Sequence, residues 1–359
     1  MKRLFVLLAI IGCCMSAQAG EKPDKNEPAG RVKIVNASVV LPSRVIEGAT
    51  ILIEQGRIVA VGTDLSTPFE GARVIDAAGR YAAPGFIDVH CHGGGGYDFS
   101  DGTVEAMLRA AEMHAQHGTT LIDPTTASCS NETLFRLFDT YRKATVQNHS
   151  GAAFGGIHIE GGYLSQEMKG GQDPRYIKNP TPEDYNAILA AGGDLIARWT
   201  FAPELPGSEG LIEELARRGI QMSMGHTSAL YEEAVAAYDA GMSSITHFYS
   251  MTSSVTRRNA LRYAGVPAII EDGVAKLPDR SAFAGSVCTT DRVVRSYVTK
   301  TGATLPEAVQ IMTLTPARLM KIDDRKGSIA PGKDADIVLF DDGINVSLTM
   351  IGGRVVYGK

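Results

Sequence analysis

The sequence is poor in the residues that mark several protein classes. Its 359 residues include five cysteines, and the formal net charge is only −5. Beyond the N-terminal stretch just three cysteines remain: Cys91, Cys129 and Cys288. An odd number this small allows one disulfide but no disulfide framework. The weak acidic balance gives no reason to expect nucleic-acid binding.

The N-terminus combines a basic start, Lys2 and Arg3, with an apolar run up to Cys14 and small residues at Ala17 and Ala19. This pattern predicts a secretory signal peptide over residues 1–19, too short to span a membrane as a mature helix. We therefore expect an exported, periplasmic protein without a transmembrane span. An alternative is a lipoprotein acylated at Cys13, since "IIGC" precedes that position. Residues 20–30 are polar and predict a flexible linker.

Short Val- and Ile-rich strands are expected at both ends of the chain, over residues 31–80 and 334–359. They predict one small β-sandwich built from the two termini. Residues 81–333 instead alternate strand and helix, which is typical of a parallel sheet and favours a (β/α)8-type barrel. The expected strands are 84–90, 119–124, 153–160, 196–202, 220–226 and 243–248.

The alternation stops after residue 248. Residue 270 already lies in an apparent hairpin, and helices are expected at 291–301 and 305–320. About six strand–helix units are visible where a closed barrel needs eight, so the predicted barrel is incomplete. Such a sheet has open edges, which favour pairing with another chain, and we expect a homodimer.

Polar side chains recur at the predicted strand ends. In "FIDVHCHGGGG" His90 and His92 share one face of a strand, and "GIHIEGG", "MGHTS" and "ITHFYS" add three further candidates, Glu160, His226 and His247. Ligands that converge at one rim of a parallel barrel predict a metal site. Imidazole and carboxylate suit zinc, with iron or manganese as alternatives.

The remaining candidates are weaker. His90 and His92 are interpreted as a second, weaker metal position. His158 shares the face of Glu160 but lies deeper, as a core residue or a partner of the ligands. Cys91 points to the opposite face and is expected in the core. His114, His117 and His149 make no pattern and are interpreted as ordinary hydrogen-bonding residues.

Several long motifs in a fixed order resemble one family. They are "PGFIDVHCHGGGG", "HIEGGYLSQEMKGGQDPRYI", "FAPE", "GHTSALYEEAVAAYDAG", "THFYS" and "RKGSIAPGKDADIVLFDD". Together they resemble the N-acetylglucosamine-6-phosphate deacetylases of the amidohydrolase superfamily, from about residue 31 to the end. The resemblance implies a metal-bearing (β/α)8 barrel with a small β-sandwich. It also implies removal of an N-acetyl group from an amino sugar, giving acetate.

The resemblance also implies roles for individual residues. Glu160, His226 and His247 would be the main metal ligands, and His90 with His92 the second pair. The metal would polarise the acetamide carbonyl and lower the pKa of a bound water. Substrate-binding positions would be Gln172, where the family has histidine, Ser250, where it has asparagine, and Arg257 or Arg258 for the phosphate.

The family's "DGxH" and "TDA" segments, from the last two barrel strands, have no counterpart here. The aspartate of the latter is the family's general base and acid, so no catalytic residue is identified. Asp272 falls in the expected hairpin and Asp291 at the start of a later helix. General acid–base help contributes about 10²–10⁴-fold in rate. The alternatives are therefore a catalytically inactive member that still binds metal and, more distantly, an amidohydrolase that acts on cyclic amides.

Overall fold

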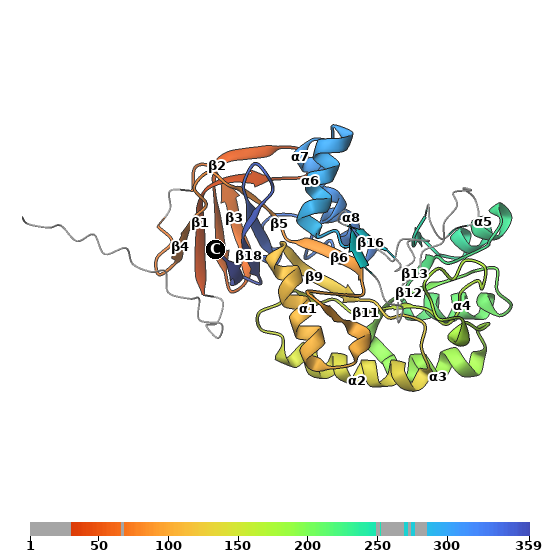
Figure 1. Cartoon of the computed structure of the whole chain (residues 1–359). Coiled ribbons are helices and arrows are strands. Elements are labelled where there is room, and N and C mark those ends of the chain that lie inside the picture. Colours follow the sequence, from red (N-terminus) through yellow and green to blue (C-terminus); the bar gives the residue numbers. More distant parts are fainter. Residues whose placement is uncertain (1–29, 66–67, 249–251, 253–268, 272–273, 277–285) are drawn as a thin grey trace, which may run out of the picture.

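Strands from both ends of the chain form one mixed sheet, at the left of Figure 1. The computed structural model describes residues 30–65, 68–248, 252, 269–271, 274–276 and 286–359. The sheet has eight strands in the order β19-β18-β17-β5-β1-β2-β3, with β4 paired to β1. The strands are β1 (Arg31–Val40), β2 (Val45–Glu54), β3 (Arg57–Gly62), β4 (Arg73–Asp76), β5 (Tyr81–Pro84), β17 (Ile337–Phe340), β18 (Val346–Ile351) and β19 (Arg354–Gly358).

The two chain ends meet where β5 pairs antiparallel with β17, with Ala82 opposite Leu339. A compact apolar core holds them together, and Ile34, Ile51 and Ile337 in it are fully buried. At the β2–β3 turn, Gln55 and Gly56 both have positive φ, 47° and 76°. This conformation matches a two-residue hairpin turn.

The central part of the chain builds a series of parallel strands. They are β6 (Phe86–Cys91), β9 (Thr119–Pro124), β10 (Ala153–Phe154), β11 (Ile157–Glu160), β12 (Ile196–Phe201), β13 (Gln221–Met224) and β14 (Ser244–Ile245). Strands β6, β9 and β10 form one parallel sheet and β11 to β14 another, and a parallel bridge between Thr125 and His158 joins the two. All six expected strand positions are therefore found.

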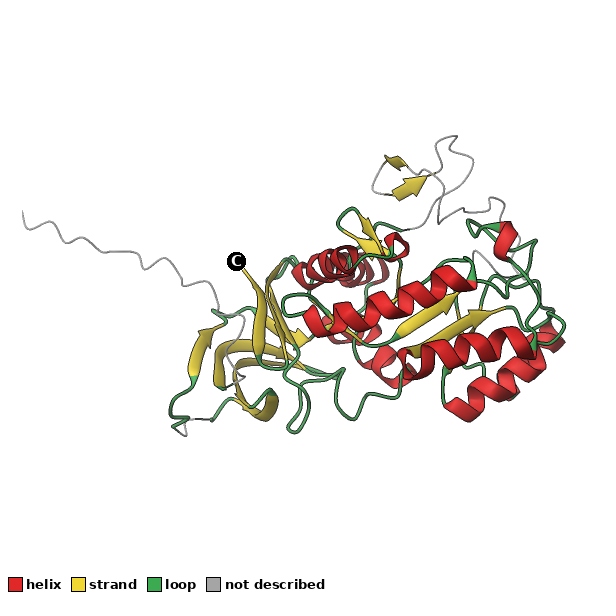
Figure 2. Cartoon of the chain, turned by 90° about the horizontal axis from the view of Figure 1, so that it is seen from below, coloured by secondary structure: helices red, strands yellow, loops and turns green. Residues whose placement is uncertain are grey.

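Helices cover the outer face of these strands in chain order (Figure 1). They are α1 (Val104–Gln116), α2 (Asn131–Gln147), α3 (Pro182–Gly192), α4 (Ser208–Arg218) and α5 (Tyr231–Asp239). Hydroxyl side chains of Thr103, Ser130 and Thr181 cap the first three by accepting a backbone N–H of the first turn. Figure 2 shows the helices lying alongside the strands.

The period of two along each strand decides which side chains face the interior. In β11, Ile157 and Ile159 pack outward into the apolar core beneath the helices, so His158 and Glu160 face inward. In β12, Trp199 packs outward in the same way. The inward face therefore carries the polar residues that the sequence places at alternate positions.

The parallel series ends at β14 in the part of the chain that the structure describes. The expected hairpin is present as antiparallel strands β15 (Ile269–Glu271) and β16 (Val274–Lys276). Asp291 lies in the first turn of helix α6 (Thr290–Thr301), as expected.

The helix expected at 305–320 is instead two helices, α7 (Leu305–Ile311) and α8 (Leu314–Leu319). Pro316 explains the difference, because it lacks the N–H that would bond to the carbonyl of Met312. That carbonyl accepts the backbone N–H of Ile87 instead, with an N–O distance of 2.7 Å. The helix break thus satisfies a donor on the outer side of β6.

No helix among the described residues is long and apolar enough to cross a membrane.

Arg198 and Asp123 are charged residues buried inside the strand series. Arg198 donates to Ser223, at 3.0 Å, and to Thr246, at 3.2 Å. The Oδ2 atom of Asp123, on β9, has no hydrogen-bond partner among the described residues. Burial raises the pKa of Asp123 to about 7, although Arg198 opposes the rise. The interior therefore favours the protonated form of this carboxyl.

The Asp123→Asn substitution should flatten the pH dependence of stability. The folded protein takes up a proton on Asp123 near pH 7, whereas the unfolded chain does so near 3.8, so stability from this group falls as pH rises through that window. Urea unfolding at pH 5 and pH 8.5 should show a smaller loss for the variant, by roughly 2–4 kcal/mol. Exposed Asp239→Asn is the control. Equal losses in wild type and Asp123→Asn would contradict the expectation.

Candidate metal centre

Four imidazoles converge on one buried carboxylate. Glu160 ends strand β11 and is 1% exposed. His90 lies near the end of β6 and His92 just beyond it, while His226 follows β13 and His247 follows β14. The structure therefore brings together all five residues that the sequence predicts as metal ligands, although they come from four separate strands.

The two oxygens of Glu160 face different histidine pairs. Oε1 lies 3.3 Å from Nε2 of His226 and 3.0 Å from Nε2 of His247. Oε2 lies 3.1 Å from Nε2 of His92 and 3.5 Å from Nε2 of His90. We call these the Oε1 half and the Oε2 half of the site. Each half groups three ligand atoms within 4.8 Å of one another.

Local backbone geometry aims two of these imidazoles. His226 and His247 have φ values of 50° and 57°, in the left-handed region that non-glycine residues rarely adopt. Such conformations cost about 1–3 kcal/mol and persist where surrounding contacts enforce them. Here they turn the chain sharply at the strand ends, where the imidazoles face Glu160.

A hydrogen bond fixes the tautomer of His226. Its Nδ1 lies 2.8 Å from the carbonyl oxygen of Met168, which can only accept, so Nδ1 carries the proton. A neutral His226 then presents a lone pair on Nε2 toward Oε1 of Glu160. Both of these buried atoms lack a hydrogen-bond partner among the described residues. A cation between two facing acceptors satisfies both, so this donor set fits a metal ion.

The electrostatics support a deprotonated carboxylate. Burial raises the pKa of Glu160, whereas the surrounding imidazoles, those of His90 and His247 first, lower it, and the net direction is well below its usual value. Burial lowers the pKa of His90 to about 4, despite the opposing effect of Glu160. At neutral pH His90 is therefore uncharged, the form in which imidazole binds metals.

His158 lies behind this cluster. Its Nε2 is 2.7 Å from the hydroxyl oxygen of Thr200, and its Nδ1 is 3.1 Å from that of Thr125. Its ring centroid is 4.8 Å from that of His90. Since both nitrogens have hydroxyl partners, His158 supports the His90 ring and does not face the carboxylate.

The four predicted substrate-binding positions differ in what the structure shows. Gln172 is buried, and its amide contacts Glu160 and Ser128. Ser250, Arg257 and Arg258 lie outside the described residues.

The missing base has no replacement in Asp291, which pairs with His117 at 3.2 Å on another part of the molecule. Asp272 also lies outside the described residues. Within the part described, the groups around Glu160 contain no other carboxylate.

Sequence reasoning missed Glu204, which follows β12 in the "FAPE" motif. Its Oε1 accepts the backbone N–H of Ser228 at 2.6 Å, and its Oε2 accepts the hydroxyl of Thr227. These bonds anchor the turn that directly follows His226. The position of Glu204 at the end of a predicted strand was the available signal, because the ligands occupy equivalent positions.

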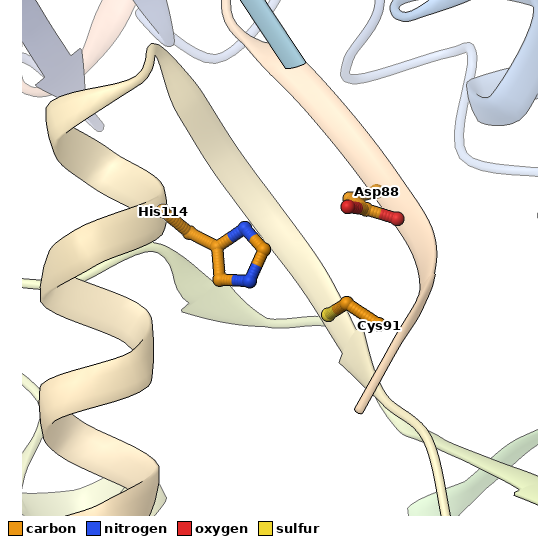
Figure 3. Close-up of side chains that lie close together, drawn as sticks. All are labelled: Asp88, Cys91 and His114. Atoms are coloured by element: carbon orange, nitrogen blue, oxygen red, sulfur yellow. The ribbon is translucent and has the colours of Figure 1, made fainter. Parts of the chain in front are cut away.

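A further group, Asp88, Cys91 and His114, lies between β6 and helix α1, and Figure 3 shows His114 projecting toward β6. Nε2 of His114 donates to the carbonyl of Gly93 at 3.1 Å, and Asp88 accepts the backbone N–H of His90 at 3.1 Å. Burial raises the pKa of the Cys91 thiol well above its usual value, which keeps it neutral. We interpret this group as packing and hydrogen bonding that hold β6 in place.

A model of the amidohydrolase family matches residues 81–276 and 279–356. The chain therefore belongs to the amidohydrolase family.

Individual relatives of the chain have names that give a particular activity within this family. The chain is 28% identical to the N-acetylglucosamine-6-phosphate deacetylase of Rattus norvegicus over 387 residues, which covers 88% of this chain and 94% of the relative. It is 26% identical to the N-acetylgalactosamine-6-phosphate deacetylase of Escherichia coli O157:H7, over 76% of this chain and 86% of the relative. The crystal structure of N-acetylglucosamine-6-phosphate deacetylase from Pasteurella multocida matches with a TM-score of 0.82 at 25% identity, over 90% of this chain and 99% of that one. The resemblance and the fold class predicted from the motifs are confirmed.

The comparisons also bear on the missing segment. The match to the rat enzyme spans 387 aligned positions, more than the 359 residues of this chain, so that relative carries segments without a counterpart here.

Zinc should stabilise this protein through Glu160. A ligand that binds only the folded state at 100 times its Kd adds about 2.7 kcal/mol to the free energy of unfolding. Thermal unfolding of the wild type should therefore show a higher Tm with zinc than with a chelator. The Glu160→Gln variant, which keeps the size but removes the charge, should lose this difference. Exposed His149→Gln should keep it; an unchanged zinc effect in Glu160→Gln would contradict the assignment.

Proposed function

We propose that this chain is a metal-dependent hydrolase that removes the N-acetyl group of N-acetylglucosamine 6-phosphate or a related acetamido sugar, giving acetate and the amino sugar. Membership of the amidohydrolase family and the activities named for its relatives support this proposal. The observation that carries it is the buried Glu160 carboxylate between two histidine pairs.

The five ligand residues would form two metal positions that share Glu160. His226 and His247 would hold a divalent ion with Oε1 of Glu160, and His90 and His92 a second, weaker one with Oε2. Zinc suits these ligands, with iron or manganese as alternatives. When bound, the ion supplies Lewis acidity toward the acetamide carbonyl and the attacking water. The protein contributes a buried carboxylate and a His90 imidazole whose pKa burial lowers to about 4.

Hydrolysis also needs a group that transfers protons, in addition to the metal. The aspartate that serves related deacetylases as base and acid lies in a segment that this sequence lacks. We expect turnover to be slower than in complete relatives by about 10²–10⁴-fold. A catalytically inactive member that still binds metal is the second candidate. The absence of the family's "TDA" motif favours it, whereas the complete set of ligand residues favours the active enzyme.

The sugar and its phosphate are proposed from the relatives. They act on 6-phosphates of N-acetylglucosamine or N-acetylgalactosamine, by their names. Arg257 or Arg258 would bind the phosphate through a bidentate guanidinium contact. Ser250 would contact the sugar. Export favours an unphosphorylated acetamido sugar as the alternative, because sugar phosphates are mainly intracellular compounds. We also propose a homodimer.

Acetate release from N-acetylglucosamine 6-phosphate by residues 20–359 with zinc is the direct test. Detectable release should disappear in Glu160→Ala and His226→Ala, because each removes a ligand of the Oε1 half. The His149→Gln variant, prepared in the same way, should keep the acetate release of the wild type. N-acetylgalactosamine 6-phosphate and the free sugars, assayed in parallel, report specificity. Zinc binding without acetate release from any of them would establish the inactive member instead, while activity on cyclic amides alone would require a different substrate class.

We propose that the chain is exported to the periplasm. Mass spectrometry of the protein expressed in a Gram-negative host should show a mature N-terminus at Gly20, since the small residues at Ala17 and Ala19 precede that bond. Replacing Ala17 and Ala19 by leucine should leave the precursor uncleaved. A lipid-modified N-terminus at Cys13, lost in Cys13→Ser, would support the anchored alternative. An intact Met1 on a cytoplasmic protein would contradict export.

A further inference from the structure

Gln172 is a buried amide, 5% exposed, on the loop between β11 and α3. Its Oε1 accepts the backbone N–H of Ser128 at 2.7 Å. Its Nε2 donates to Oε2 of Glu160 at 3.2 Å. Both ends of the side chain are therefore engaged within the protein, and one of them is engaged with the central carboxylate.

These two contacts permit only one orientation of the amide. A backbone N–H can only donate and a carboxylate can only accept, so the oxygen of Gln172 must face Ser128 and its NH₂ must face Glu160. A flipped amide would place two acceptors together at Glu160 and two donors together at Ser128. The hydrogen-bond partners therefore assign the oxygen and the nitrogen of the Gln172 amide, which are nearly identical in shape.

The partner of Gln172 is itself held firmly. Gly161 has φ of +136°, and a Cβ there would lie 2.6 Å from the nitrogen of Ser128. The backbone N–H of Gly162 donates to the hydroxyl of Ser128 at 3.3 Å. The loop after β9 and the loop after β11 are therefore in close contact, and Ser128 is a rigid anchor for Gln172.

The contact divides the two oxygens of Glu160. Oε2 receives the Gln172 amide and faces His92, whereas Oε1 faces His226 and His247 and has no hydrogen-bond partner among the described residues. A carboxylate oxygen has two lone-pair directions. With one used by Gln172, Oε2 retains one direction for a cation beside His90 and His92.

We propose that Gln172 is a positioning residue for the Oε2 half of the site, which orients Glu160 toward a cation held with His90 and His92. Its amide is used inside the protein and does not bind the sugar, the role that the family resemblance implied. This inference rests on the proposed function, since it requires a cation at Glu160. Loss of such hydrogen-bonded partners typically lowers metal affinity about 10–100-fold.

Zinc affinity measured by chelator competition tests the proposal with the full chain. Gln172→Met keeps the length of the side chain but removes its donor and acceptor. Gln166→Met is the matched control, because Gln166 lies on the same loop, is exposed, and donates its side-chain hydrogen bond to the carbonyl of Pro174, away from Glu160. Circular dichroism and Tm without metal report whether each variant folds.

Gln172→Met is combined with either of two further substitutions, each of which weakens one half of the site. His247→Asn weakens the Oε1 half and His92→Asn the Oε2 half. We expect Gln172→Met to lower zinc affinity about 10–100-fold in His247→Asn, where the Oε2 half remains. In His92→Asn the same change should have an effect of less than about threefold. A non-additive pair of this kind indicates coupling through one half, which a general loss of structure would not produce.

The outcomes are distinguishable. Equal effects of Gln172→Met in both backgrounds, or no effect in either, would overturn the positioning role, as would failure of the His247→Asn protein to bind zinc. Equal loss with Gln166→Met would do the same. If the wild type binds no zinc, or if Glu160→Ala binds as much as the wild type, the metal site of the proposed function fails as well.

Discussion

The burial of one carboxylate charge is the constraint on which this site depends. An ionised carboxylate far from water is costly unless charge or hydrogen bonds compensate for it. At Glu160 one amide donates a hydrogen bond and four imidazoles face the two oxygens, and these groups come from the ends of β6, β13 and β14 and from the β11–α3 loop. The order of the strands, the strained turns at His226 and His247, and the docking of the β11–α3 loop all serve to bring these groups within contact of the two oxygens.

The loop between β11 and α3 links the two halves. The Met168 carbonyl sets the tautomer of His226, and Gln172 orients the other oxygen of Glu160. The Ser165 N–H donates to the His226 carbonyl at 2.8 Å. The bond from Nδ1 of His226 to the Met168 carbonyl is the kind that metal-ligating histidines commonly make with their second ring nitrogen. One surface segment thus fixes both a histidine and the carboxylate, so the geometry of the site depends on that loop as much as on the strands.

Much of this arrangement follows from the sequence. The period of two places His158 and Glu160 on one face, and strand ends in a parallel series share a rim, so the five ligand candidates could be predicted to converge. The orientation of Gln172 could not, because it depends on Ser128, forty-four positions away in sequence. The positive φ values at His226 and His247 were also hidden, since histidine does not mark such a conformation as glycine does. The break before Pro316 was accessible in principle, because proline removes a helical donor.

The ligands and the missing base belong to different parts of the fold. Glu160 and the four histidines all lie on or directly after strands between β6 and β14. The base of related deacetylases derives from later strands whose motifs are absent here. Metal binding needs only the first set, because each ligand is held by contacts within that set or by the adjoining loop. Rapid turnover needs both. A sequence without the later motifs could therefore keep its metal site under the same folding constraints while its catalytic rate is lower, and the two properties must be measured separately.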